Sequence, residues 1–403
     1  PWIVHGGDAG ILVAWEVTSS SSHVLAWDST AVNNGGSSLY SLPGTKALGI
    51  AIGNIDSDPA LEVLVGSGSG QVFAFDGVTR ALDWTSPVLD KLPISIGIAD
   101  LDGDGEMEIA ISTGNPGEDR LAESGEGAEG YLYIFDRSGS DFTQTFRSEN
   151  INQAMGLVIS ELDGSNYPEI GLATGFVQVS LGGNTDYVGH VRVFGYDGSG
   201  YDEEWSSGDL GTPVRGIAAG DPDDDGQNEL VVGTSDGDVL VFHHSGANYV
   251  QDGATITTGR VEAYGLAIAD LDGDGDTEII VGTGKESSDK KPLIQIYRGS
   301  NHVKEWEKTI VTSSVWGVLC VDLDDDGVVE LIYGTSGGEL FVKDGEDLTK
   351  QAEGQTSALS GMTGHYGNIR MANLDGEGAN ELVFGSTAYL WVFTVEGATA
   401  DPD

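Results

Sequence analysis

The sequence predicts an all-β fold built from one repeated unit, and two observations carry that prediction. A nine-residue acidic pattern recurs seven times along the 403 residues, and each copy ends in a Glu. Short apolar segments with period-two alternation surround these copies, and no window shows a sustained helical pattern. The copies begin 46 to 61 residues apart, a period typical of an array of similar units.

Each unit is expected to contain four short antiparallel strands. The first precedes the acidic pattern, as in 216–220 and 265–269, and the second follows it, as in 229–234, 278–283 and 381–386. The third alternates strictly, as in 131–136, 238–242 and 390–394. A more polar fourth strand is expected around Trp84, Trp205 and Trp306. Four such strands repeated about seven times predict a β-propeller of four-stranded antiparallel blades.

The acidic pattern places an oxygen-bearing side chain at its first, third, fifth and ninth positions. The four best copies contain Asp100, Asp102, Asp104 and Glu108; Asp221, Asp223, Asp225 and Glu229; Asp270, Asp272, Asp274 and Glu278; and Asp322, Asp324, Asp326 and Glu330. A fifth copy contains Asn373, Asp375, Glu377 and Glu381. Two weaker copies contain Glu161, Asp163, Ser165 and Glu169, and Asn54, Asp56, Asp58 and Glu62, the last with Pro59 at the sixth position.

The spacing of these oxygens predicts calcium sites. Calcium takes six to eight oxygen ligands in a flexible geometry, and a tight loop with alternating carboxylates supplies them. Five copies have Gly at the sixth position, where the chain must turn sharply: Gly105, Gly226, Gly275, Gly327 and Gly378. An Asp-rich turn is the simpler alternative, but it does not explain the repeated Glu. We expect about four to seven Ca²⁺ ions, with the two weaker copies binding weakly or serving only as turns.

The unit from Gly265 to Gly282 resembles the FG-GAP/VCBS repeat, the calcium-binding blade of integrin-α-type propellers. The resemblance covers residues 46–397 in seven repeats. It implies a propeller with calcium held between the first and second strands of a blade, at one end of the wheel. It does not imply one function, because such blades occur in adhesion receptors, lectin-like surface proteins and some polysaccharide lyases.

The number of blades is predicted less directly than their type. Residues 1–45 lack the acidic pattern but contain strand-like segments at 11–17 and 23–28, with a further strand near Leu39. We expect a single propeller domain over 1–403 with eight blades, the first degenerate, and a seven-bladed wheel as the alternative. In that alternative 1–45 closes the ring, and 398–403 is a tail in both.

Composition predicts an extracellular protein. The chain carries 65 acidic and 18 basic residues, for a net charge of −47, which disfavours nucleic acid and anionic lipid as partners. One cysteine, Cys320, excludes an internal disulfide framework and is expected to be a small core residue. Calcium loops of modest affinity suit the millimolar calcium outside cells. No apolar segment is long enough to insert into a membrane, and the start at Pro1 suggests a processed chain or a piece of a longer one.

Side chains entering the first strands are expected to meet at the mouth of the central channel. The candidates for ligand binding there are Arg215, Tyr264, Trp316, His365 and Tyr366, with Met155 as a neighbour. The alternative is that the large apolar members simply plug the channel.

Two functions are therefore considered. The favoured one is a non-catalytic, calcium-stabilised module at the cell surface that binds protein or carbohydrate in adhesion or assembly, self-assembly included, with no catalytic residue assigned. The alternative is a polysaccharide lyase or other carbohydrate-active enzyme, for which Arg215, Tyr264, His365 and Tyr366, or the weaker pair His190 and Arg192, would supply acid–base groups. The shortage of basic residues argues against an anionic polymer as substrate.

Overall fold

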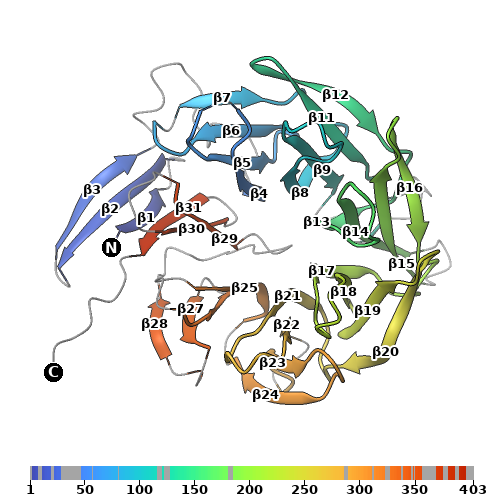
Figure 1. Ribbon diagram of the computed structural model, residues 1–403. Helices are drawn as coiled ribbons and strands as arrows, with labels where there is room; N and C mark the ends of the chain where they lie inside the picture. Colours follow the sequence, from blue (N-terminus) through green and yellow to red (C-terminus); the bar gives the residue numbers. More distant parts are fainter. Residues whose placement is uncertain are drawn as a thin grey trace.

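The computed structural model contains 31 strands, and no helix occurs among the residues that it describes (Figure 1). The described residues are 2–7, 11–19, 22–28, 47–56, 58–79, 81–115, 120–121, 128–179, 185–285, 289–310, 313–322, 327–336, 339–345, 348, 350–355, 369–374, 380–385 and 390–395. Within this part of the chain no helix is long and apolar enough to cross a membrane.

Six antiparallel sheets have four consecutive blade strands, ordered from the centre of the ring outward. The first three consist of β4 (Ala47–Gly53), β5 (Glu62–Ser67), β6 (Val72–Asp76) and β7 (Leu82–Thr85); β8 (Leu92–Ala99), β9 (Glu108–Gly114), β11 (Leu132–Ser138) and β12 (Asp141–Arg147); and β13 (Ala154–Ser160), β14 (Glu169–Val179), β15 (Thr185–Tyr196) and β16 (Tyr201–Ser206). The short β10 (Arg120–Leu121) pairs in parallel with β14.

The next three sheets repeat the same order. They consist of β17 (Val214–Gly220), β18 (Glu229–Thr234), β19 (Asp238–His244) and β20 (Tyr249–Thr257); β21 (Ala263–Ala269), β22 (Glu278–Thr283), β23 (Leu293–Arg298) and β24 (Lys304–Thr309); and β25 (Val315–Val321), β26 (Glu330–Thr335), β27 (Glu339–Asp344) and β28 (Lys350–Gln355). The predicted propeller of four-stranded antiparallel blades is therefore confirmed.

Two further sheets have three strands each. One contains β29 (Ile369–Ala372), β30 (Asn380–Gly385) and β31 (Leu390–Val395), and the other contains β1 (Trp2–Gly7), β2 (Ile11–Ser19) and β3 (Ser22–Asp28). The described residues thus form six complete four-stranded blades. The expected number of eight, and the alternative of seven, are therefore wrong. The expected strand near Leu39 lies outside the described residues.

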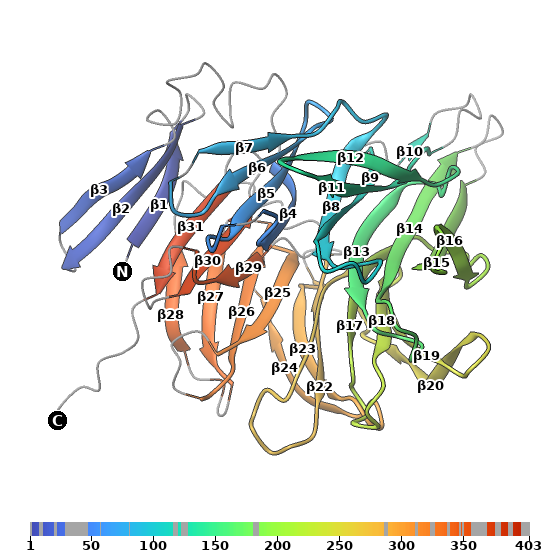
Figure 2. The same ribbon diagram turned by 45° about the horizontal axis from the view of Figure 1, so that its top comes forward.

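The position of β1–β3 explains this difference from the expectation. The first strands follow one another around the ring, and β29 contacts both β25 and β4. No position therefore remains between β29 and β4 for a separate first blade. Instead β1 lies beside β31, at the outer side of the last sheet (Figures 1 and 2).

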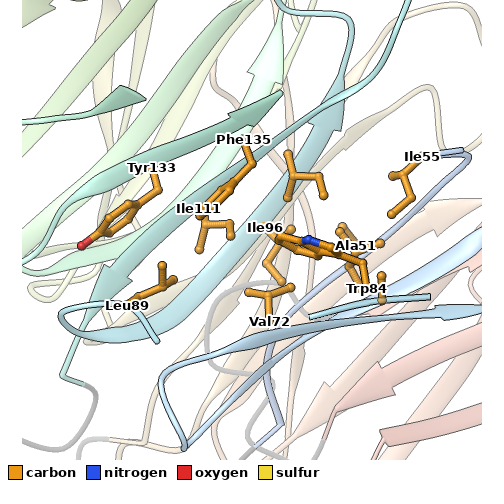
Figure 3. Close-up of a cluster of buried hydrophobic side chains, with 12 residues drawn as sticks. Ala51, Ile55, Val72, Trp84, Leu89, Ile96, Ile111, Tyr133 and Phe135 are labelled. Carbon is orange, nitrogen blue, oxygen red and sulfur yellow. The ribbon is translucent and has the colours of Figure 1, made fainter. Parts of the chain in front are cut away.

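The hydrophobic core lies between neighbouring blades rather than inside one of them. Figure 3 shows one such cluster, in which Trp84 of β7 packs against Phe135 of the next blade at a ring-centroid distance of 5.6 Å. Trp205 of β16 makes the corresponding contact with Phe242 at 5.5 Å. The predicted fourth strands are thus confirmed, and their tryptophans join adjacent blades. Full burial of an aromatic side chain of this kind stabilises a protein by roughly 1.5–3 kcal/mol.

The recurrent Gly-Thr at the end of the second strands also has a packing role. A Cβ atom at Gly233 would lie 2.2 Å from the carbonyl oxygen of Ala263 in the next blade, so only glycine permits this approach. The adjacent Thr234 hydroxyl donates to the carbonyl oxygen of Asp238 at 3.1 Å, and Thr283 bonds Leu293 in the same way at 3.2 Å. The glycine therefore allows the close approach of the next blade, and the threonine joins the second strand to the third by a hydrogen bond.

Candidate metal centre

The seven acidic loops lie between the first and second strands of their sheets, and each is named here by its first residue. In the 100 loop, Asp100 follows β8 directly and Glu108 begins β9. The 54, 161, 221, 270 and 322 loops share this placement, and in the 373 loop Glu381 is the second residue of β30. Because all the loops join the same two strands of a blade, they lie on one face of the propeller.

The sharp turn predicted at the sixth position is present wherever the structure describes it. Gly105, Gly226, Gly275 and Gly327 have φ values of 90°, 91°, 92° and 90°, a region that residues with a Cβ rarely adopt. In each of these loops the sixth amide donates to a carboxylate oxygen of the first Asp, as from Gly226 to Asp221 Oδ2 at 2.8 Å. This hydrogen bond holds the loop closed around its carboxylates.

The ninth-position Glu is buried in every copy, with an exposed fraction of 0% for Glu62 and at most 3%, for Glu229. One carboxylate oxygen accepts the amide of the second loop residue in five copies: Ile55, Leu101, Leu162, Leu271 and Leu374, at 2.7–2.9 Å. Those second residues are themselves at most 3% exposed. Each Glu therefore fastens its loop to the core.

The other oxygen of this Glu is the strongest indication of a cation. Glu62 Oε1, Glu229 Oε2 and Glu278 Oε1 are buried and have no hydrogen-bond donor among the described residues. Burial, with a smaller contribution from acidic neighbours, raises the pKa of Glu62, Glu108, Glu169 and Glu278 to about 7 and that of Glu229 to about 8. A buried carboxylate without a positive partner is costly, whereas a bound cation would satisfy it.

Among the described residues, at least four loops bring three carboxylates within 4.8 Å of one another. The groups are Asp56, Asp58 and Glu62; Asp100, Asp102 and Glu108; Glu161, Asp163 and Glu169; and Asp221, Asp223 and Asp225. The 54 and 161 loops, ranked lowest from sequence, therefore assemble their acids as well as the best copies do. In the 161 loop, Ser165 Oγ also donates to Glu169 Oε1 at 3.2 Å. An all-oxygen donor set of this kind fits Ca²⁺.

The remaining candidate ligands are described less completely. In the 270 loop, Asp272 Oδ1 accepts the amide of Asp274 at 3.2 Å, and Asp270 Oδ1 is buried with no donor from any described residue. In the 322 and 373 loops, the described ligand residues are Asp322, Glu330, Asn373 and Glu381. Asp324, Asp326, Asp375 and Glu377 lie outside the described residues.

Two further acids near the 54 loop were not predicted from sequence. Asp76, which ends β6, and Asp83, on β7, form a carboxylate group with Glu62 within 4.8 Å. Strand register places Asp76 opposite Glu62, and Asp344 opposite Glu330 in a later blade. The sequence signal was an Asp at the end of the alternating third segment, which is visible without the structure but has no meaning until strand register is known.

Hydrogen bonds connect neighbouring loops around the ring. Asp224, at the fourth position of the 221 loop, accepts both the amide and the hydroxyl of Thr277 in the 270 loop, at 3.0 and 2.7 Å. On the other side, Asn228 Nδ2 donates to the carbonyl oxygen of Glu161 at 3.1 Å. Three successive loops are therefore physically linked.

The predicted channel residues occupy one structural position, a β-bulge near the start of the first strand. Register shifts leave Arg215, Tyr264 and Trp316 as the extra residue of β17, β21 and β25, and Met155 takes the same place in β13. Bulges redirect side chains, and here they bring these side chains together: Arg215 Nη1 lies 3.8 Å from Met155 Sδ, and the Tyr264 and Trp316 rings are 6.1 Å apart. His365 and Tyr366 lie outside the described residues.

His190 and Arg192, the weaker acid–base pair considered from the sequence, lie on β15 and take part in structural contacts. Arg192 forms an ion pair with Glu203 at 2.7 Å. Burial, and then the nearby Arg192 charge, lower the pKa of His190. Cys320 is partly buried at the end of β25, where burial raises its pKa to about 12.

Comparisons with known proteins agree with the fold and with the repeat. The chain aligns with the crystal structure of Saccharomyces cerevisiae Sqt1 at a TM-score of 0.60 and 10% identity, covering 98% of this chain and 93% of that one. Two structures of BBS1N in complex with ARL6DN, soaked with lead and with mercury, align at a TM-score of 0.56, with 12% and 13% identity. They cover 89% of this chain and 94% and 96% of theirs.

At such identities the alignments establish the fold alone. No curated protein sequence matches the chain. The FG-GAP-like repeat family matches residues 221–281, which span the 221 loop, β18 to β21, the 270 loop and part of β22. Residues 221–281 therefore match an FG-GAP-like repeat and are part of a β-propeller.

Proposed function

We propose that this chain is an extracellular, non-catalytic binding module whose propeller is stabilised by calcium. The observation that carries the proposal is the ninth-position Glu, which is buried in every loop and, in Glu62, Glu229 and Glu278, keeps one oxygen without a donor among the described residues. These oxygens lie in loops whose other candidate ligand side chains are carboxylates and an amide. A Ca²⁺ ion would satisfy the buried oxygen and offset the repulsion among the acids.

Calcium fits these loops better than other common cations. They contain no His or Cys, the ligands that zinc and copper favour. Magnesium requires near-ideal octahedral geometry and loses its water reluctantly. Several partly exposed carboxylates on one loop therefore favour the larger ion, and we propose about four to seven ions per chain.

The same chemistry suggests where the protein works. Each bound ion removes two negative charges from a chain whose net charge is −47, so occupancy should matter greatly for stability. Loops of this openness suit the millimolar calcium found outside cells. Propellers and FG-GAP domains commonly mediate protein interactions, and the proposed partner is a protein or carbohydrate at the cell surface, with self-assembly as a variant of the same role.

The test is a calcium titration of the calcium-stripped chain by isothermal calorimetry, with melting temperature measured in parallel. We expect several calcium ions to bind per chain, magnesium to bind much more weakly, and chelator to lower the melting temperature. Binding of fewer than one ion per chain, or identical melting in calcium and in chelator, would contradict the proposal. A panel of surface glycans tested for both binding and turnover separates a binding module from an enzyme.

A further inference from the structure

Three carboxylates meet on the strands of the first four-stranded sheet, beside the 54 loop. One oxygen from each of Glu62, Asp76 and Asp83 lies within 4.8 Å of the others. Glu62 begins β5, Asp76 ends β6, and Asp83 lies on the outer strand β7. This group, called the strand carboxylates below, shares only Glu62 with the nine-residue pattern.

Strand register explains why these three side chains meet. Asp76 is the residue of β6 opposite Glu62. On β7, Trp84 pairs with Ala74, whereas Leu82 pairs with the residue after Ala74, so Asp83 is the extra residue of a β-bulge. A bulge turns a side chain out of the regular alternation of its strand. Here it places the Asp83 carboxylate beside that of Asp76.

The same bulge recurs in later blades, where its extra residue lies beside the end of the third strand. In the second sheet this residue is Thr145, whose hydroxyl donates to Asp136 at 2.8 Å. In the sheet of β21 to β24 it is Glu305, which forms an ion pair with Arg298 at 2.8 Å. Both pairs join groups that attract each other. The first sheet has an acid at both positions, so the two carboxylates, when ionised, repel each other unless a cation lies between them.

The burial of the strand carboxylates indicates that they are directed at a ligand. Glu62 is 0% exposed and Asp76 is 6% exposed. Glu62 Oε2 accepts an amide of the 54 loop at 2.8 Å, whereas Oε1 is buried and has no hydrogen-bond donor among the described residues. The Asp76 carboxylate accepts the amide of Val78 at 2.9 Å, so the turn after β6 holds it in place. Asp83 is exposed, which leaves the group open to an ion and to water.

The acids at this corner of the propeller exceed the charge of one divalent ion. The loop group of Asp56, Asp58 and Glu62 and the strand carboxylates overlap in Glu62, so five carboxylates lie together. Burial, and then the charges of Asp76, Asp56 and Asp58, raise the pKa of Asp83 above its ordinary value. One divalent ion would leave three of the five negative charges, and two ions would leave one.

We propose that Glu62, Asp76 and Asp83 bind a second Ca²⁺ ion beside the ion of the 54 loop, with Glu62 bridging the two ions. Three carboxylates, together with water on the open side, supply the six to eight oxygens that calcium takes. Ions in two-metal sites lie ~3.5–4 Å apart, a separation that a shared carboxylate spans. This site rests on the proposed function, because both ions are expected to be calcium, and it adds two ligand residues that the nine-residue pattern lacks.

The first measurement counts the calcium bound per chain at saturation, by equilibrium dialysis and atomic emission. Asp83→Thr is the matched variant, because Thr145 occupies the same bulge position in the next blade. Asp202→Thr, which makes the same change of charge at an exposed site on β16, is the control. We expect Asp83→Thr to bind one ion fewer than the wild type and the control. In chelator it should melt no lower than the wild type, because it removes one of the repelling acids, and this melt also shows that it folds.

The second measurement uses Mn²⁺, which also takes oxygen ligands, to test whether two ions are adjacent. Ions that share a carboxylate are magnetically coupled, so the electron paramagnetic resonance spectrum of the manganese-loaded wild type should contain a coupled signal. Asp83→Thr should remove this signal and keep the uncoupled signals of ions held singly in the other loops.

The second site is overturned if Asp83→Thr binds as much calcium as the wild type, if Asp202→Thr also loses an ion, or if the wild type gives no coupled signal. In each of these cases calcium bound in the other loops would leave the proposed function intact. A chain that binds no calcium at all would refute both proposals.

Discussion

Replacing Glu278 by Gln should stabilise the calcium-free protein and reduce the stabilisation that calcium provides. In the calcium-free protein at about pH 8, Glu278 is a buried carboxylate with one oxygen that has no donor in the part of the chain that the structure describes. Burial raises its pKa from 4.5 to about 7, and at ~1.4 kcal/mol per unit its ionisation costs the folded state about 3 kcal/mol. Gln has the same shape, its carbonyl oxygen can accept the Leu271 amide, and it carries no charge.

We therefore expect Glu278→Gln to raise the melting temperature in chelator. For 403 residues that unfold together, 3 kcal/mol corresponds to about 3–4 °C. In calcium the two proteins should melt at nearly the same temperature, because the wild type gains binding energy through this carboxylate and the variant has lost a ligand. A site with calcium at 100 times its Kd contributes about 2.7 kcal/mol, so the calcium-induced rise should be smaller in the variant by about 3 °C.

The measurement is differential scanning calorimetry of both proteins in calcium and in chelator, with Glu149→Gln, an exposed site outside the loops, as the control. A variant that melts below the wild type in chelator would show that Glu278 is not an uncompensated buried charge. An equal calcium-induced rise in both proteins would show that it is not a ligand.

Three further changes test the loops, and one tests the packing between blades. Burial raises the pKa of Glu229 to about 8 and the pKa of Glu62, Glu108, Glu169 and Glu278 to about 7. The stability that these groups contribute without calcium should therefore be highest below about pH 4.5 and fall as pH rises through 7–8. Thermal melts in calcium should show a flatter profile, and a rise in stability with pH in chelator would refute this. Asp224→Asn removes one of the two oxygen acceptors for Thr277 and should therefore lower the calcium affinity severalfold in a titration. An exposed Asp→Asn change on β16 should leave the calcium affinity unchanged. Arg298→Gln removes a positive charge beside the 270 loop and should therefore raise the calcium affinity of that loop. An unchanged calcium-binding isotherm would contradict this prediction. Trp84→Ala should destabilise the fold by about 3–5 kcal/mol in denaturant unfolding, with or without calcium.

The repeat made the structure of a single blade predictable from the sequence. The way in which the ring closes could not be predicted from it. Alternation in 131–136 and 238–242 is local and indicates β11 and β19 directly. The number of blades depends instead on which strands meet across the ring. Only the contact of β29 with β4 shows that β1–β3 occupy no separate position in it. A degenerate segment of one unit's length is compatible with either arrangement when it is read alone.

The channel shows a similar limit. Arg215 and Tyr264 were found because they precede recognisable first strands. Arg370, which lines a cavity in the channel together with Arg215, was missed, because the sequence of a strand does not show whether a given side chain faces a cavity or a neighbouring blade. Comparing the repeats position by position would have singled it out, as it interrupts a row of small and apolar residues.

The same register argument shows why the nine-residue pattern alone ranks the loops poorly. The 100 and 270 loops have nearly the same motif, yet the residue at the end of the third strand beside the ninth Glu differs. It is Asp136 beside Glu108, whose pKa this Asp helps to raise, and Arg298 opposite Glu278. Arg298 pairs with Asp276 at 2.9 Å and Glu305 at 2.8 Å, so its positive charge sits beside the 270 loop and opposes a cation there. Calcium affinity should therefore follow the summed charge around each Glu, and loops with the same motif should fill at different calcium concentrations.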